Sequence, residues 1–171
     1  MSRIVMIGGH GKVALLASPL LVDAGHEVVS LIRNPDHSAD VAATGATPLV
    51  LSVEEADVAE LTRVFAGADA IVWSAGAGGK GGPERTDAVD RAAAIRSMEA
   101  AAAAGVTRYV MVSFLTAYGE VPDDHPLRAY AIAKIAADRH LQATDLDWTI
   151  LGPGLLTLEE PTGAITVARV P

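Results

Sequence analysis

The chain has 171 residues, a formal net charge of −8 and no cysteine, and half of its residues are hydrophobic. This length suits one globular domain, and the acidic balance argues against nucleic acid or an anionic membrane as the main partner. The composition and spacing also exclude a disulfide framework, give no metal-binding motif, and contain neither a signal peptide nor a membrane-spanning run, so we expect a cytoplasmic protein.

Apolar, β-rich runs alternate with helical patterns along the chain. The runs predicted as strands are Arg3–Ile7, Glu27–Ile32, Thr47–Leu51, Ala70–Ser74, Arg108–Ser113 and Trp148–Leu151. Helical patterns occupy residues 12–24, 36–44, 54–66, 84–104 and 126–143. Helix-ending glycines are expected at Gly25, Gly45, Gly67 and Gly105. Repeated βαβ units with right-handed crossovers predict an α/β fold with a doubly wound, Rossmann-like parallel sheet, in a single domain over residues 1–171.

The first predicted strand enters a glycine turn, residues 8–11, and a helical pattern begins immediately after it. This arrangement directs free backbone N–H groups and the positive end of a helix dipole at one point, where a dinucleotide pyrophosphate can bind. Gly8 is expected to make the tight turn, and Gly11 to let the backbone approach the phosphates. An ordinary βα loop is the alternative interpretation. The apolar face of the helix is expected to comprise Val13, Leu16, Leu20 and Leu21.

Two further segments extend this prediction toward a cofactor. Arg33 follows the second predicted strand, about twenty residues after the turn, where a residue that contacts the adenosine ribose is expected. An acidic residue there would favour NAD, whereas an arginine can pair with the 2′-phosphate of NADP. A solvated loop arginine is the alternative. The segment Ser74–Ala77 opens a glycine-rich stretch after the fourth strand, and it predicts either a cofactor contact or a flexible connection.

A catalytic pair is predicted on the last helical pattern. Tyr130 and Lys134 are four residues apart and therefore share a helix face. A nearby ammonium favours the phenolate, so Lys134 is predicted to lower the pKa of Tyr130, which would act as a general acid while Lys134 holds the nicotinamide ribose. Ser113 closes the fifth strand and is expected either to polarise a substrate carbonyl or to serve a turn. Thr116 offers a competing hydroxyl, and an incidental surface pair is the alternative for Tyr130 and Lys134.

With these motifs together, the chain resembles the short-chain dehydrogenase/reductases, and in particular their atypical branch of NAD(P)H-binding and NmrA-like proteins. The phrases that carry the resemblance to this branch are Gly25–Val28, Arg33–Pro35, Gly67–Ala70, Ala104–Val106 and Asp147–Ile150. The resemblance covers nearly the whole chain. It implies pyrophosphate contacts from Gly8, His10, Gly11, Lys12 and Val13. It also implies that Arg33 binds the adenosine phosphate, Ala75 and Gly76 lie beside the ribose, and Pro153 lies near the nicotinamide.

The chain departs from this family at several positions. Ser52 stands where the family often has an aspartate that contacts adenine, so either cofactor is allowed. Gly152 stands where many members carry arginine, and Phe114 replaces a second serine after Ser113. The sequence stops soon after the sixth predicted strand. Either the C-terminal helix and strand usual in the family are missing, or the substrate pocket is minimal.

Three functions follow from these observations. The first is an NADP-dependent oxidoreductase, with NAD as the alternative cofactor, that reduces a small carbonyl or quinone-like acceptor. The second is a non-catalytic dinucleotide sensor of the NmrA-like kind, which the departures at Phe114 and Gly152 favour. The third, a sugar-nucleotide epimerase or dehydratase, is disfavoured because little chain follows residue 152. The sequence names neither the substrate nor the oligomeric state.

Overall fold

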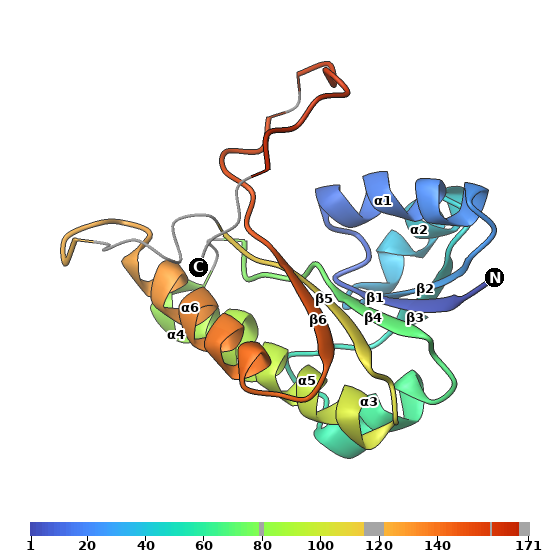
Figure 1. The fold of residues 1–171 in the computed structure, drawn as a ribbon, viewed down its shortest axis with the longest axis horizontal. Helices are drawn as coiled ribbons and strands as arrows, with labels where there is room; N and C mark the ends of the chain where they lie inside the picture. The colour runs from blue at the N-terminus through green and yellow to red at the C-terminus, as the bar shows by residue number, and fades with distance from the viewer. Residues whose placement is uncertain (79–80, 115–121, 158, 168–171) are drawn as a thin grey trace.

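The computed structural model describes residues 1–78, 81–114, 122–157 and 159–167, which form a parallel sheet between two layers of helices (Figure 1). The strands are β1 (Arg3–Ile7), β2 (Glu27–Ile32), β3 (Thr47–Val50), β4 (Ala70–Trp73), β5 (Arg108–Val112) and β6 (Asp147–Leu151). Across the described ranges these six strands pair in parallel, in the order β3-β2-β1-β4-β5-β6. The doubly wound, Rossmann-like fold is therefore confirmed. The strand order reverses between β1 and β4, where open α/β sheets bind ligands.

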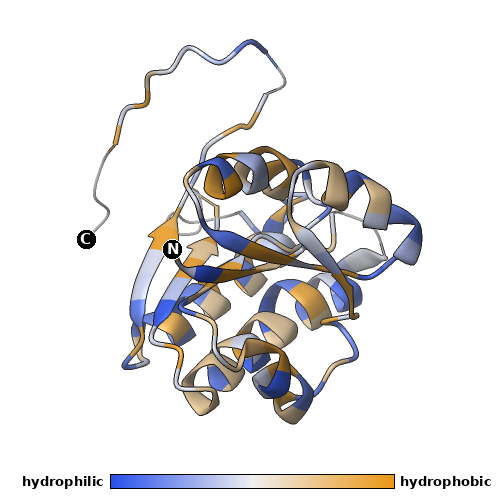
Figure 2. Cartoon of the chain, turned by 90° about the vertical axis from the view of Figure 1, so that its right-hand side faces the viewer, coloured by the Kyte–Doolittle hydropathy of each residue, from blue (hydrophilic) through white to orange (hydrophobic). Residues whose placement is uncertain are grey.

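The helical elements are α1 (Lys12–Asp23), η1 (Pro35–His37), α2 (Ser38–Ala43), α3 (Val58–Phe65), α4 (Gly82–Thr86), η2 (Asp87–Ala93), α5 (Ala94–Ala103) and α6 (Arg128–Gln142). Helices α1 and α2 cover one face of the sheet, and α3, α5 and α6 cover the other (Figures 1 and 2). Predicted bounds and observed bounds differ where a local contact decides them. Asp57 accepts a hydrogen bond from the Glu60 N–H at 2.7 Å, so α3 begins at Val58 and not at residue 54.

The alternation of side chains along the strands gives the sheet two cores. Val5 and Ile7 of β1 pack into the larger cluster, on the side of α3, α5 and α6, whereas Met6 packs into the smaller cluster with α1 and α2. The predicted apolar face of α1 was wrong at Leu16 and Leu20, which are exposed, whereas Leu21 packs against the core as expected. The helix fully buries its small residues Ala14 and Ser18, and Leu15, Leu21 and Val22 pack, partly buried, against the same core.

Glycines end four helices as predicted, with positive φ at Gly25, Gly45, Gly67 and Gly105. The remaining described residues after β6 run as an extended segment away from the two helical layers (Figure 2). The loops that follow each strand at its carboxyl end therefore lie at one edge of the sheet, next to the amino end of α1.

Candidate functional site

The turn after β1 is held tightly against its neighbours. Gly9 donates to the carbonyl of Leu31 at 2.8 Å, and Gly11 donates to that of Gly8 at 2.8 Å. Gly8 has a φ of 81°, and a Cβ placed on it would lie 2.6 Å from the Cα of Ala75. Glycine is thus required at Gly8 both for its conformation and for the close approach of the loop after β4.

The amino end of α1 is open toward this edge of the sheet. Its N-cap, Gly11, provides no side-chain acceptor, and the first turn contains no acidic residue. The first N–H groups of a helix lack intrahelical partners, and the helix dipole makes that end positive. Lys12 adds a cationic side chain at the same place. This donor set fits a dinucleotide pyrophosphate, with backbone N–H groups and Lys12 as its ligands.

Two cavities meet at this helix end. One has a volume of about 550 Å³ and extends over β2 and β3, and the other, of about 670 Å³, extends toward β5, β6 and α6. Gly11, Lys12 and the loop after β4 line both, so the two form a continuous groove along the carboxyl ends of the strands. The predicted site residues that line the first cavity are Gly8, His10, Gly11, Lys12, Arg33, Ser52, Ala75 and Gly76. Those that line the second are Gly11, Lys12, Val13, Ser113, Ala75, Gly76, Tyr130, Lys134 and Pro153. The alternative hydroxyl, Thr116, lies outside the described residues.

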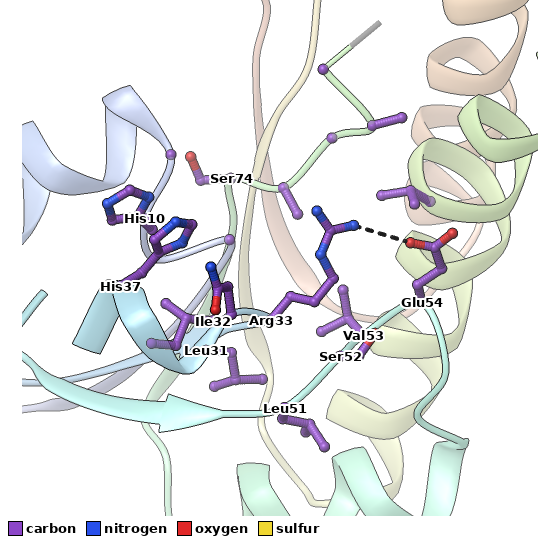
Figure 3. A pocket seen from close by; sticks show the side chains of 18 of the residues that line it. His10, Leu31, Ile32, Arg33, His37, Leu51, Ser52, Val53, Glu54 and Ser74 are labelled. Carbon is purple, nitrogen blue, oxygen red and sulfur yellow. Dashed lines mark ion pairs between the residues drawn. The ribbon is translucent and has the colours of Figure 1, made fainter. Parts of the chain in front are cut away.

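The first cavity has a charged wall where an adenosine ribose is expected. Arg33 is the sequence-predicted anion ligand, and its side chain reaches across the cavity toward Glu54, with Nη1 3.5 Å from Oε2 (Figure 3). Arg85 of α4 contacts the same carboxylate at 3.2 Å. Sequence reasoning missed Glu54 and Arg85, because they come from the loop after β3 and from α4, and no local spacing links either of them to Arg33.

A stacked pair of histidines borders the same cavity. The rings of His10 and His37 are parallel to within 15°, with centroids 3.6 Å apart (Figure 3). His10 Nε2 also lies 2.9 Å from Asp40 Oδ2. The ring of His10 is therefore fixed beside the glycine turn, which gives a reason for its place in the lining of the cavity.

The second cavity ends on Ser113, Tyr130 and Lys134, but their contacts differ from those predicted. Lys134 is only 2% exposed, and its Nζ donates to the carbonyl of Val112 at 3.1 Å and lies 3.7 Å from Asp90 Oδ1. Its Nζ is 5.8 Å from the centroid of the Tyr130 ring. The predicted lowering of the Tyr130 pKa was wrong. Burial, with Asp90 and then Asp138 nearby, raises the pKa of Tyr130 to about 12.

Two buried carboxyls, Asp90 and Asp138, surround Lys134. Asp90 is fully buried and accepts a hydrogen bond from the Ala77 N–H at 3.0 Å. Asp138 is 1% exposed and accepts one from the Ser113 hydroxyl at 2.5 Å. Burial raises the pKa of both carboxyls and lowers that of Lys134, although the opposite charges counteract these shifts. The Ser113 hydroxyl is thus engaged by Asp138 in this structure, and it must turn away to reach a substrate.

Of these two carboxyls, only Asp138 had a signal in the sequence. It follows Lys134 by four residues and so extends the Tyr130–Lys134 face by one helical turn. Asp90 belongs to η2, a π-helical segment that no periodicity in the sequence marked. Its contact with Lys134 depends on how η2 packs against α6.

In the described part of the chain, no group of three or more histidine, aspartate or glutamate side chains is placed to hold a metal ion. None of the helices in those ranges is long and apolar enough to cross a bilayer.

Comparison with known proteins places this geometry in a family. The model of a family described as NAD(P)H-binding matches residues 8–170. YhfK of Bacillus subtilis, by name an uncharacterized sugar epimerase, is 33% identical over 98% of this chain and 78% of its own. A Bacillus halodurans structure with the provisional name NAD-dependent epimerase/dehydratase is 34% identical, with a TM-score of 0.89 over 97% of this chain and 76% of that one. The structure of the Lactococcus lactis oxidoreductase ylbE is 30% identical, with a TM-score of 0.79 over 94% of this chain and 73% of that one.

Proposed function

The chain belongs to the NAD(P)H-binding family, of the atypical short-chain dehydrogenase/reductase group, and from this premise we propose that it is an NADP-dependent reductase of small carbonyl or quinone-like acceptors. The observation that carries the proposal is the continuous groove from the charged wall at Arg33, past the open end of α1, to Ser113 and Tyr130. The groove joins an anion site to a proton donor, which is what a dinucleotide-dependent reductase needs.

The cofactor-binding residues in this proposal are those along the groove. The N–H groups of Lys12 and Val13, at the amino end of α1, bind the pyrophosphate, and the side chain of Lys12 adds positive charge. Arg33 is 62% exposed at its side chain and therefore free to reorient toward a 2′-phosphate. A charge-assisted contact of this kind favours NADP over NAD.

The proton chemistry falls to Tyr130 and Ser113. When bound, a reduced nicotinamide supplies two electrons and one hydrogen to the acceptor carbon. Since its pKa is about 12, Tyr130 carries its proton at neutral pH and is able to donate it to the acceptor oxygen. The Ser113 hydroxyl, once turned from Asp138, donates a hydrogen bond to the same oxygen and orients it. Lys134 contacts Asp90 and the carbonyl of Val112, so its effect on the site is indirect and passes through these two groups.

The substrate end of the groove suits a small apolar molecule. Its lining includes Pro83, Pro126, Leu127 and Leu156 around Tyr130. An apolar wall with a few convergent polar groups is the usual design of a small-molecule site, and it offers few partners to the hydroxyls of a sugar. This composition favours a carbonyl or quinone-like acceptor over a sugar nucleotide.

A non-catalytic sensor is the second candidate, and one contact favours it. Lys134 Nζ contacts Asp90 and the carbonyl of Val112, and the pKa of Tyr130 is raised to about 12 and not lowered toward neutrality. A sensor needs the binding half of the groove only.

One experiment separates the two functions. NADPH and NADH are titrated into the protein, and NADPH oxidation is then followed at saturating cofactor with a panel of aldehydes, ketones and quinones. We expect tighter binding of NADPH and turnover of at least one acceptor, which Tyr130→Phe lowers about a hundredfold or more. Tight binding with no turnover across the panel supports the sensor, and no binding of either dinucleotide refutes both functions.

A further inference from the structure

Glu54 lies between two arginines in the wall of the first cavity. Its Oε2 is 3.5 Å from Arg33 Nη1 (Figure 3) and 3.2 Å from Arg85 Nη2, and all three residues line the cavity. The Glu54 side chain is 28% exposed. A carboxylate so placed stands next to the position that a phosphate on the ribose must occupy if Arg33 is to bind it.

The two arginines hold Glu54 unequally. Arg85 donates from Nε to both carboxylate oxygens, at 3.3 and 3.2 Å, and from Nη2 to Oε2 at 3.2 Å. Its side chain is 24% exposed, and Gly81 leaves room for it, since a Cβ there would lie 2.5 Å from Arg85 Cδ. Arg33 makes a single, longer contact and is far more exposed. Glu54 is therefore principally the partner of Arg85, and Arg33 is the arginine that can break its contact with Glu54.

From this asymmetry we infer that Arg85 is a specificity-determining residue, which acts by engaging Glu54 so that Arg33 remains free to bind the 2′-phosphate of NADP. The inference rests on the proposed function. Without Arg85, the carboxylate of Glu54 would turn fully to Arg33, occupy its guanidinium and repel a phosphate. Without Glu54, both arginines would face the phosphate with no competing anion. Arg85 is thus a positioning residue whose effect passes through Glu54.

The inference gives opposite signs for the two substitutions. Arg85→Gln is expected to weaken NADPH binding about tenfold and to leave NADH within about twofold, because only NADPH carries the additional phosphate. Glu54→Gln is expected to strengthen NADPH binding about tenfold. In the double variant the competing charge and its partner are both absent, so the affinity for NADPH returns to within about threefold of the wild type.

The experiment measures the dissociation constants of NADPH and NADH by calorimetry for the wild type and these three variants. Matched controls are Arg91→Gln, whose arginine pairs with Asp87 on the outer surface, and Glu55→Gln, an exposed neighbour of Glu54 outside the cavity lining. Both controls are expected to bind like the wild type. Thermal melting of each variant confirms that it is folded. If Arg85→Gln does not fold, Glu54→Gln alone decides the question.

Three results would overturn the inference while leaving the proposed function intact. The first is an unchanged ratio of NADPH to NADH affinity in Glu54→Gln. The second is weaker NADH binding in Glu54→Gln, which would mean that Glu54 accepts a hydrogen bond from a ribose hydroxyl. The third is a double variant that binds NADPH as poorly as Arg85→Gln, which would mean that Arg85 contacts the phosphate itself. If the wild type binds neither dinucleotide, the proposed function and the inference fall together.

Discussion

Lys134→Met tests whether attraction between the Lys134 ammonium and the carboxyls of Asp90 and Asp138 stabilises the fold. The lysine is 2% exposed and lies 3.7 Å from a carboxylate oxygen of Asp90. Removing one partner of a buried ion pair costs about 3–5 kcal/mol, because the remaining charge stays buried without compensation. Methionine fills a similar volume, so an added cavity contributes little. For a chain of this length, the loss corresponds to a decrease in Tm of about 10 °C.

The loss of unfolding free energy in Lys134→Met depends on pH. The two buried carboxyls determine the direction of that dependence. Burial raises the pKa of Asp90 and Asp138 above their ordinary value of 3.8, so the folded state binds more protons than the unfolded chain above that value. Such groups favour folding at low pH, and this contribution is lost as the pH rises through the raised pKa. Without the ammonium the pKa values rise further. The destabilisation is therefore larger at about pH 7.5 than at about pH 5.

Urea unfolding at both pH values, followed by circular dichroism, measures this difference. Asp138→Asn is the matched comparison, because it removes one buried charge while its amide oxygen can still accept from Ser113. We expect it to change the free energy of unfolding by less than about 1 kcal/mol, since the lost desolvation cost offsets the lost attraction. Equal losses for Lys134→Met at the two pH values would refute the electrostatic account of the cluster.

The remaining predictions concern binding, chemistry and the glycine turn. Arg33→Ala is expected to weaken NADPH binding about ten- to a hundredfold and to spare NADH, as measured by calorimetry; equal losses would assign Arg33 a structural role. Tyr130→Phe is expected to lower turnover about a hundredfold or more at unchanged cofactor affinity, and full steady-state activity would exclude it as the proton donor. Gly8→Ala is expected to cost about 3 kcal/mol, since its Cβ meets Ala75, against about 1 kcal/mol for Gly25→Ala, which has the same sign of φ and open space around it. Similar melting temperatures for the two glycine variants would contradict the close approach.

The fold was accessible from the sequence because its signals are local. Strands buried on both faces of a parallel sheet appear as continuous apolar runs, and the predicted bounds of β1 and β2 match the structure. Helix ends marked by Gly25 and Gly105 are equally local. The face of α1 was mispredicted because leucines at helical spacing were assumed to face the sheet, whereas Leu16 is exposed. The residues of α1 that are fully buried are the small ones, Ala14 and Ser18, which the leucine spacing did not indicate.

The same distinction, between local signals and contacts of residues far apart in the sequence, applies to the candidate site. Each predicted site residue follows a strand or lies on one helix face, and the structure brings all of them to the lining of one groove. The partners that decide their chemistry come from elsewhere. Glu54 and Arg85 meet across 31 positions, and Asp90 and Lys134 across 44, from 90 to 134. No periodicity connects residues at such separations, so the charge state of Tyr130 could not be deduced from its spacing to Lys134.

The charged side chains are exposed at one end of the groove and buried at the other. This difference determines how each end can be tested. At the proposed adenosine end Arg33 is largely exposed, so water screens its charge, and we expect a substitution there to alter cofactor selectivity with little effect on folding. At the other end Lys134 and Asp138 are buried, so the same kind of substitution changes the free energy of unfolding as well as the proton donor's surroundings. A loss of turnover at Lys134 is therefore ambiguous unless stability is measured with it. Tyr130→Phe, which keeps the ring and all three charges of the cluster, is the substitution that isolates the chemical step.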